Sequence, residues 1–106
     1  MATGILGTAD LAANTNTTLY TVPVSTFAVV TVSLCNRGAA AADVRIAVSD
    51  SGTPGNADYL EFDSSVLAKG VLERTGIVLQ AGKLIVCRAN ATDVNVVVTG
   101  IETATA

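Results

Sequence analysis

Hydrophobic and polar residues alternate along most of this chain, in short runs that end at turn-forming residues. The clearest run, residues 27–36, places Ala28, Val30, Val32 and Leu34 on one face of a strand. The other runs that favour strands cover residues 3–9, 17–23, 42–50, 59–63, 71–79, 83–89 and 94–101. The pattern predicts an all-β fold, a single β-sandwich or jelly-roll-like domain of about eight short antiparallel strands.

The run ADVRIAVSD alternates as strictly as the first. Its Val44, Ile46 and Val48 are expected to point inward, and Ala47 and Ser49 to point outward. One face of this strand should therefore contribute to the core.

The segments between these runs are rich in Gly, Pro, Ser and Asn. The longest of them, residues 50–58 (DSGTPGNAD), is predicted to be an exposed loop and a candidate contact surface. Residues 38–43 (GAAAAD) are the one helix-like stretch and are too short to hold a helix. The domain is expected to span 1–106, with 1–16 as an extended N-terminal arm and 102–106 as a loose tail.

A Glu-Arg pair interrupts the apolar run GVLERTGIVL. Adjacent residues of a strand point to opposite faces, so Glu73 and Arg74 are expected to find separate partners: a cross-strand charge, a neighbouring loop or an adjacent subunit. Neither face of this strand is uniformly apolar, so Gly76 is predicted to mark a bulge or bend. Surface ion pairs contribute only ~0–1 kcal/mol, so such contacts would orient more than stabilise.

Composition narrows the possible functions. The chain has 106 residues, only 4% aromatic and none of them Trp, so its core must be built mainly from Val, Ile and Leu. Its net charge of −3 and its six scattered basic residues argue against nucleic-acid binding. No apolar run approaches the ~20 residues of a membrane-spanning helix, and the N-terminus lacks the pattern of a signal peptide. We therefore expect no membrane association, and a chain that stays in the cytoplasm or leaves by a route such as lysis.

Two cysteines, Cys35 and Cys87, lie in separate apolar runs. The favoured interpretation is a pair of buried, reduced thiols that act as small hydrophobic residues. The alternative is an inter-sheet disulfide of the immunoglobulin kind, against which stands the absence of Trp.

Catalytic chemistry is scarce in this sequence. Without His there is no His-based acid–base or nucleophilic catalysis, and two isolated cysteines cannot complete a four-ligand zinc site. Glu61 and Asp63 are expected to share one strand face with Tyr59, while Leu60 and Phe62 share the other. Such carboxylates could serve glycoside hydrolysis or bind a divalent cation, but an outward polar face is the favoured interpretation. We expect no catalytic residue, no metal site, no cofactor and no enzymatic activity.

Four stretches of the chain are familiar as a set. They are NTTLYTVP (16–23), VSLCNRG (32–38), ADYLEFD (57–63) and GVLERTGIVLQAGK (70–83). In this order they resemble small virion structural proteins of tailed bacteriophages, including phages of cyanobacteria and other aquatic bacteria. The resemblance extends over nearly the whole chain and therefore concerns the entire domain.

The resemblance implies a non-enzymatic virion structural protein, foremost a capsid decoration (cement) protein that binds and stabilises the assembled head. Its partners would be the major capsid protein or another virion protein, with self-association as a dimer or trimer. It would be assembled in the host cytoplasm and released in the virion by lysis. A second hypothesis keeps the chain in the virion, as a tail, baseplate or fibre-attachment component.

A third hypothesis is a bacterial cell-surface or carbohydrate-binding β-sandwich module. Such modules usually expose aromatic side chains that stack on sugar rings. This chain has only Tyr20, Phe27, Tyr59 and Phe62, and both Phe residues are expected in the core. The missing secretion signal also argues against this hypothesis.

Contacts with a virion partner are expected from two segments and from the Glu-Arg pair. The N-terminal segment could add a strand to the open sheet edge of a neighbour, and the loop 50–58 could touch another subunit. The candidate interface residues are Thr3, Ile5, Leu6, Thr53, Pro54, Asn56, Glu73 and Arg74.

Overall fold

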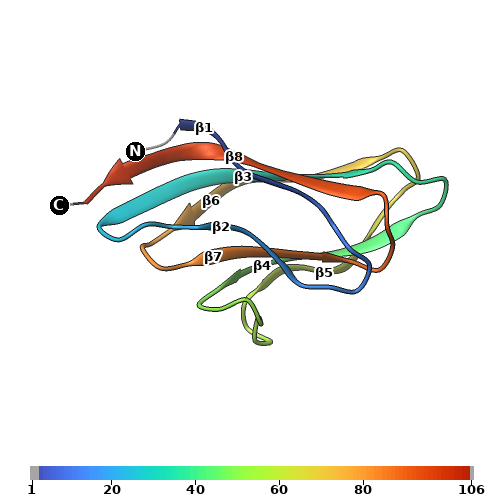
Figure 1. Cartoon of the computed structure of the whole chain (residues 1–106), viewed down its shortest axis with the longest axis horizontal. Coiled ribbons are helices and arrows are strands. Elements are labelled where there is room, and N and C mark those ends of the chain that lie inside the picture. The colour runs from blue at the N-terminus through green and yellow to red at the C-terminus, as the bar shows by residue number, and fades with distance from the viewer. Residues whose placement is uncertain (1–2, 106) are drawn as a thin grey trace.

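The computed structural model describes residues 3–105 as a two-layered molecule (Figure 1). Within this range the strands are β1 (Thr3–Asp10), β2 (Thr17–Thr21), β3 (Thr26–Asn36), β4 (Ala42–Ser49), β5 (Tyr59–Val66), β6 (Val71–Leu79), β7 (Leu84–Ala89) and β8 (Val94–Ala104). They form two four-stranded antiparallel sheets with strand orders β1-β8-β3-β6 and β2-β7-β4-β5. The predicted all-β sandwich is confirmed. No helix long and apolar enough to cross a membrane is found among the described residues.

The chain folds as one long hairpin that has been rolled up. The first strand pairs with the last, β2 with β7, β3 with β6, and β4 with β5. The pairs β3–β8 and β4–β7 then join these hairpin arms into two sheets. Every connection except that between β4 and β5 therefore crosses from one sheet to the other, and both ends of the described chain lie at one end of the sandwich (Figure 1).

The core fills the space between the sheets with aliphatic side chains. Strand β3 shows the predicted alternation along its whole length: Ala28, Val30, Val32 and Leu34 are fully buried, and the residues between them are half-buried. β-Branched side chains suit this surface because they are stiff and pack well on a pleated sheet. Strand β3 is therefore the centre of its sheet, paired with β8 on one side and β6 on the other.

A buried asparagine fastens the turn after β3. The Nδ2 group of Asn36 donates to the carbonyl oxygens of Ala40 and Val66 (2.9 and 3.1 Å), and its Oδ1 accepts from the amide of Gly38 (2.9 Å). A buried amide left without partners costs about 1–3 kcal/mol, so these bonds select the observed turn. The side chain of Asn36 also reaches the end of β5.

The loop between β4 and β5 lies over the outer side of the sheet β2-β7-β4-β5, which we call the covered face. Ala47 and Ser49 point outward as expected, yet they are only 1% and 2% exposed. The loop reaches β2, where a Cβ on Gly52 would lie 3.6 Å from Oγ1 of Thr18. It therefore crosses over β7, whose outward Val86 is buried as well. Outward direction in this strand does not mean exposure to solvent.

Two strands extend beyond their predicted ends. β5 continues to Val66 through a stretch expected to be a turn, because it pairs with the first residues of β4. β8 continues to Ala104 because its end pairs with Thr26–Ala28 of β3. The tail expected over 102–106 is therefore part of the sheet as far as Ala104, and Ala106 lies outside the described residues.

The segment expected as an N-terminal arm contains β1, which pairs with β8 of the same chain. The register shifts between Ile5 and Gly7, and the chain passes very close to β2 at this point. A Cβ on Gly7 would lie 2.0 Å from the carbonyl oxygen of Leu19, so a larger residue requires the backbone to move. Residues 1 and 2 lie outside the described range, and a reach of this segment to a neighbouring subunit stays a prediction.

Strand β6 carries the bulge predicted at Gly76. The pairing of β3 with β6 shifts between Val30 and Val32, which leaves Thr75 and Gly76 together opposite Thr31. Gly76 has φ +68°, a left-handed conformation that glycine adopts without the steric cost of a Cβ. The bulge decides which residues of β6 face the core.

Candidate functional site

Glu73 and Arg74 take opposite sides of β6, as predicted. Arg74 stands opposite the buried Val32, and its Nη1 lies 3.2 Å from Oε2 of Glu61 in the other sheet. Glu73 stands opposite Ser33 on the outer side, and it makes no ion pair with any described residue. Arg74 thus bridges the two sheet edges formed by β5 and β6, and Glu73 faces away from it.

The carboxylates of the stretch ADYLEFD are separated by the fold. Asp58 accepts the amide of Gly55 within its own loop (2.8 Å), Glu61 turns toward the other sheet, and Asp63 binds Arg45. The prediction that Glu61 and Asp63 share a face is wrong, because the pairing of β4 with β5 shifts register twice along this stretch. Among residues 3–105 no group of three His, Cys, Asp or Glu side chains is placed to hold a metal ion.

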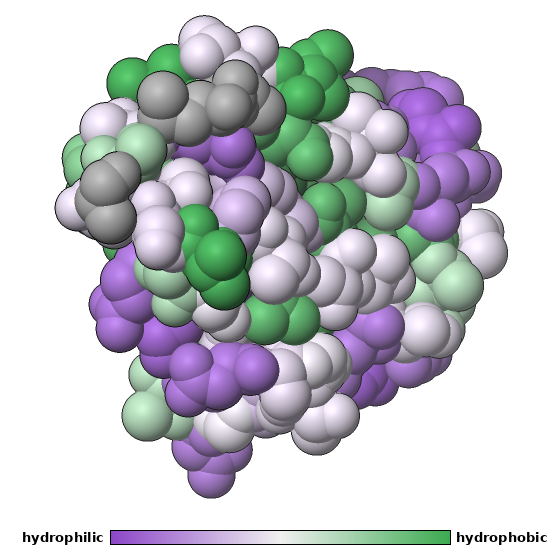
Figure 2. Space-filling view, turned by 60° about the vertical axis from the view of Figure 1, so that its left-hand side comes forward, coloured by the Kyte–Doolittle hydropathy of each residue, from purple (hydrophilic) through white to green (hydrophobic). Residues whose placement is uncertain are grey.

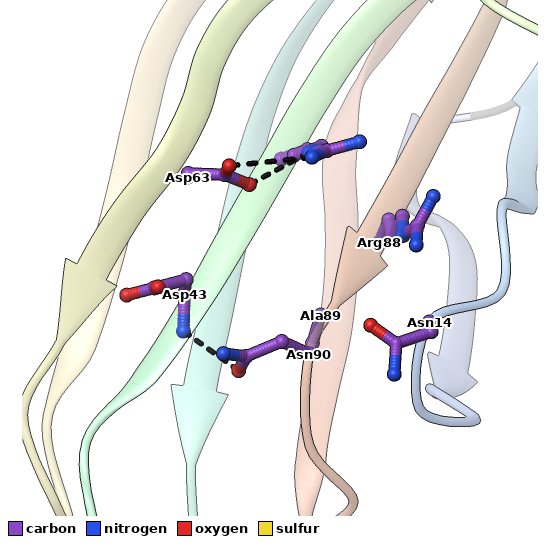
Figure 3. Close-up of a pocket in the computed structure, with 7 residues that line it drawn as sticks. Asn14, Asp43, Asp63, Arg88, Ala89 and Asn90 are labelled. Carbon is purple, nitrogen blue, oxygen red and sulfur yellow. Dashed lines mark hydrogen bonds and ion pairs between the residues drawn. The ribbon is translucent and has the colours of Figure 1, made fainter.

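A polar hollow of about 130 Å³ lies on the covered face (Figure 3). Strands β4, β5 and β7 supply most of its walls, together with the connection between β1 and β2 and the turn after β7. The residues that line the polar hollow are Asn14, Asp43, Arg45, Asp63, Arg88, Ala89 and Asn90.

Backbone hydrogen bonds fix the rim of the polar hollow. The Oδ1 of Asn90 accepts the amide of Asp43 (2.9 Å), and the carbonyl of Asp43 accepts the amide of Asn90 (3.0 Å). The amide of Asn14 donates to the carbonyl of Ala89 (2.7 Å). Asn14 has φ +56°, which Asn tolerates better than most residues. These hydrogen bonds within the chain therefore fix the shape of the polar hollow.

Arg45 and Asp63 form a two-pronged ion pair at one side of the polar hollow. Nε of Arg45 lies 2.7 Å from Oδ1 of Asp63, and Nη2 lies 3.2 Å from Oδ2. The hydrogen bond from Arg45 holds the pKa of Asp63 below its usual value, and the charge of Arg88 acts in the same direction. Arg88 makes no hydrogen bond to another described residue, so its guanidinium is available to a ligand.

Aromatic side chains lie beside the polar hollow. The ring of Phe62 is 56% exposed, lies 4.1 Å beneath the guanidinium carbon of Arg45 and meets the ring of Tyr59 edge-on, with centroids 4.8 Å apart. The prediction that Phe62 belongs to the core is wrong, because the register shifts of β5 turn it outward. Phe27 also lies outside the core, half-buried on the outer side of β3. Two Arg and two Asp leave the hollow without net charge, which suits a neutral, hydroxyl-rich ligand better than a strong anion.

Cys35 and Cys87 lie in different sheets, Cys35 on the outer side of its sheet and Cys87 on the inner side, and neither forms a disulfide. Cys87 points into the core, and burial raises the pKa of its thiol to about 12. Cys35 lies on the outer side of β3 and is only half-buried. The two cysteines are unpaired, as expected, but only Cys87 is buried. An inter-sheet disulfide between the two is wrong because they do not face the same space.

The candidate interface residues lie in three separate places. Those in β1 and β6 are on the two opposite edge strands of one sheet, and those in the loop lie over the outer side of the other sheet. Leu6 packs against the core and Arg74 pairs with Glu61, so both side chains make contacts within the chain. The fold brings none of the three groups together: Thr3, Ile5 and Leu6 in β1; Thr53, Pro54 and Asn56 in the loop; Glu73 and Arg74 in β6.

The surface that sequence reasoning identified only in part is the outer side of the sheet β1-β8-β3-β6, which we call the bare face and which includes the predicted Thr3, Ile5 and Glu73. The signal was present in β3, where Phe27 and Val29 make the second face of the strand partly apolar as well. The bare face consists of Thr3, Ile5, Thr8 and Asp10 in β1, Asn95, Val97, Thr99, Ile101 and Thr103 in β8, Phe27, Val29, Thr31, Ser33 and Cys35 in β3, and Val71, Glu73 and Val78 in β6.

Comparison with known proteins gives similarity at the level of the fold. No protein-family model matches the sequence, and no curated protein matches it. Among solved structures, a pentameric capsid protein isolated from metagenomic phage sequences is similar with a TM-score of 0.45 and 23% identity, over 93% of this chain and 64% of that chain. A second structure with the same description has a TM-score of 0.44 and 24% identity, over 93% of this chain and 63% of that chain. This chain thus spans less than two thirds of the length of those capsid proteins.

Proposed function

We propose that this chain is a non-enzymatic bacteriophage virion structural protein, and specifically a capsid decoration protein that binds the assembled head. The observation that carries the proposal is the strand order β1-β8-β3-β6 and β2-β7-β4-β5. We assign this rolled hairpin to the jelly-roll class, which viral capsid domains share with lectins and cupins. Because a fold alone does not imply a function, the roles of particular residues must agree with it.

The polar residues of the four phage-like stretches support a structural role, because they hold the sandwich together. In the stretch NTTLYTVP, the hydroxyl of Tyr20 donates to Oε2 of Glu102 in the other sheet (2.5 Å). Asn36 fastens the turn of VSLCNRG, and Arg74 of GVLERTG bridges to Glu61 of ADYLEFD. These side chains therefore serve the fold and do not assemble a reactive site.

A decoration protein stabilises a shell by binding only its assembled form. Each bound site contributes RT ln(1 + [L]/Kd), about 2.7 kcal/mol at a hundredfold excess over Kd. Many weak contacts repeated over a head therefore give large resistance to disruption. A chain without reactive groups suits this passive role.

Particle analysis tests the proposal. Purified virions of the phage that encodes this chain should contain it at a copy number comparable to that of the major capsid protein, and a reconstruction should place it on the head. A copy number that follows the rotational symmetry of the tail would instead favour the tail, baseplate or fibre-attachment alternative. Absence from the virion would overturn both. The assembly state is a separate measurement, in which the expected dimer or trimer competes with the pentamer described for the two similar capsid proteins.

The polar hollow supports a second candidate function, a carbohydrate-binding module. Arg88 and Asn90 offer hydrogen-bonding groups, and the exposed ring of Phe62 lies nearby. Because Arg45 covers one face of that ring and the ring of Tyr59 meets it edge-on, only part of the ring remains for a sugar. Titration of the protein with neutral monosaccharides and oligosaccharides, followed by backbone amide NMR, tests this function. Shifts confined to the polar hollow that vanish in Arg88→Ala would support it, and unchanged spectra would exclude it.

A further inference from the structure

We propose that the bare face is a self-association surface, and that it packs against the bare face of a second copy of this chain in a two-fold dimer. This inference names the self-association surface of the proposed virion protein, but it can be tested on the purified chain alone. Its failure would leave the proposed function standing, and absence of the chain from virions would leave the dimer standing.

Exposed apolar residues gather on the bare face. Four of the seven large hydrophobic residues that are exposed among those described belong to it: Ile5 (68%), Val71 (60%), Val78 (70%) and Ile101 (50%). In Figure 2, hydrophobic residues lie in separate groups along the upper margin of the molecule, the side on which this sheet lies in Figure 1. Several exposed apolar residues on one face of a small protein usually mark a contact site.

Apolar side chains form a row across three of the four strands of the bare face, and Thr3 of β1 continues it beside Ile101. Val29 of β3 is paired with Val78 of β6 on one side and with Ile101 of β8 on the other. The next row carries Thr31 and Thr99, whose methyl groups add apolar surface and whose hydroxyls can find partners across an interface. The two rows therefore lie side by side on the bare face.

Charge on the bare face is confined to its margins. Asp10 and Glu73 are its only charged residues, and they lie on the two edge strands. Asp10 is already paired with Arg37, with 2.6 Å between Oδ1 and Nη2. The whole chain has a net charge of −3, so two copies repel each other least when they meet through this uncharged centre. A face with few charges and a regular apolar row is complementary to itself, as a two-fold interface requires.

No segment of the described chain covers the bare face. The outward residues of its central strands, such as Val29 and Val97, are half-buried by their own neighbours, and exposure increases toward the edge strands. On the covered face the loop between β4 and β5 instead buries outward residues of the central strands, Ala47 and Val86, almost completely. The bare face thus keeps the geometry of one half of a sheet-on-sheet contact, which packs about 10 Å apart and near −30° in sandwiches.

The area of the bare face is sufficient for a dimer. Four strands about 4.8 Å apart span roughly 19 Å, and the nine residues from Phe27 to Cys35 span about 30 Å at 3.3 Å each. Two such faces together bury on the order of 1,000 Å², near the lower bound for a specific interface. The expected dimer is therefore stable but reversible.

Sedimentation analysis of matched variants tests the dimer. We expect the wild-type chain to be dimeric at about 100 µM, and the double variant Val78→Lys, Ile101→Lys to associate at least 100-fold more weakly, because each lysine would be buried without a partner. The matched control is Val24→Lys together with Leu67→Lys, at positions that are 86% and 73% exposed but outside the bare face. The control should remain dimeric, and both variants should unfold at the wild-type temperature when the protein is dilute enough for the wild type to be monomeric.

The native cysteines give a second readout of the same surface. Cys35 lies on the bare face, so a maleimide should label it slowly in the wild-type dimer and at least tenfold faster in the double variant Val78→Lys, Ile101→Lys. Cys87 is buried in the core and should stay unlabelled in every folded variant. A wild-type chain that is monomeric at about 100 µM overturns the inference, and so does an odd-numbered ring or equal dissociation of the control. If the wild-type chain is monomeric and the variant Val78→Lys, Ile101→Lys nevertheless loses binding to phage heads, the bare face contacts a shell protein and not a second copy of this chain.

Discussion

The two outer sides of the sandwich were built from similar strands, but they meet solvent differently. On the covered face a loop lies over β7, and Arg45, Asp63 and Arg88 surround a polar hollow. On the bare face, valine, isoleucine and threonine stand in rows without a cover. The covered face therefore makes its contacts within the chain, whereas the bare face leaves apolar surface for another molecule.

The largest expected effect separates the two faces directly. Val86→Asp on the covered face should destabilise the monomer by about 3 kcal/mol or more, because it buries a carboxylate without a partner. The matched change Val97→Asp on the bare face should cost less than about 1 kcal/mol, since this half-exposed position leaves the carboxylate in contact with water. Urea denaturation at low protein concentration measures both. Equal costs would remove the distinction between a covered and a bare face.

A smaller effect is expected for the hydrogen bond between Tyr20 and Glu102, which joins the two sheets. Tyr20→Phe keeps the buried ring but removes the hydrogen bond to Glu102, and should cost about 1 kcal/mol. Burial, with the hydrogen bond and the charge of Glu102, raises the pKa of Tyr20 above its usual value. The stability from this group is therefore complete below about pH 10 and is lost as the pH rises beyond it. Above about pH 10 the stability of the wild type should fall more steeply with pH than that of Tyr20→Phe. Identical stability curves would contradict a contribution from the Tyr20–Glu102 hydrogen bond.

The edge of the bare face allows a sharper comparison of neighbouring charges. Arg74→Ala should cost up to about 1 kcal/mol, because Glu61 loses its partner at the edge between the sheets. Glu73→Ala should leave the stability of the monomer within about 0.5 kcal/mol of wild type. Thermal unfolding of both variants checks this order. A larger loss from Glu73→Ala would mean that its outward carboxylate has a role in the fold.

The smallest effect concerns the polar hollow. The pKa of Asp63 lies below its usual value because of its hydrogen bond to Arg45, so its contribution is present above the unfolded pKa and is lost as the pH falls through the folded one. Asp63 is exposed to solvent and Arg45 is only half-buried, so the change should be slight. Asp63→Asn should flatten the acid limb of the stability profile in urea titrations between neutral and acid pH. A profile with the wild-type slope would show that the pair does not contribute.

Most of the fold could be predicted from the sequence because the period of alternation is local. The strand pattern at 27–36 and the bulge at Gly76 are both present as predicted. The face assignments failed in β5, where Phe62 is exposed and Asp63 turns away from Glu61. Alternation assumes that each strand keeps one register, and the two shifts against β4 depend on the partner strand.

Candidate sites were less predictable than strands. The polar hollow joins Asn14, Asp43, Asp63 and Arg88, which are far apart in the sequence and meet only because β5, β4 and β7 lie side by side. The same topology places the predicted interface residues far apart, in β1, in the loop between β4 and β5, and in β6. Only Thr3, Ile5 and Glu73 of the bare face were chosen, because threonine and half-exposed valine in a central strand look like ordinary alternation.

By itself the sequence determined that this chain is all-β, where most of its strands begin and end, and that it lacks His-based chemistry. These properties depend on residue type and on spacing along a few neighbours. Only the tertiary structure decided that Arg74 bridges the sheets, that a loop buries Ala47, and that one sheet keeps an uncovered apolar side. These depend on which strands become neighbours in space, and strand pairing is set by packing of the whole rolled hairpin.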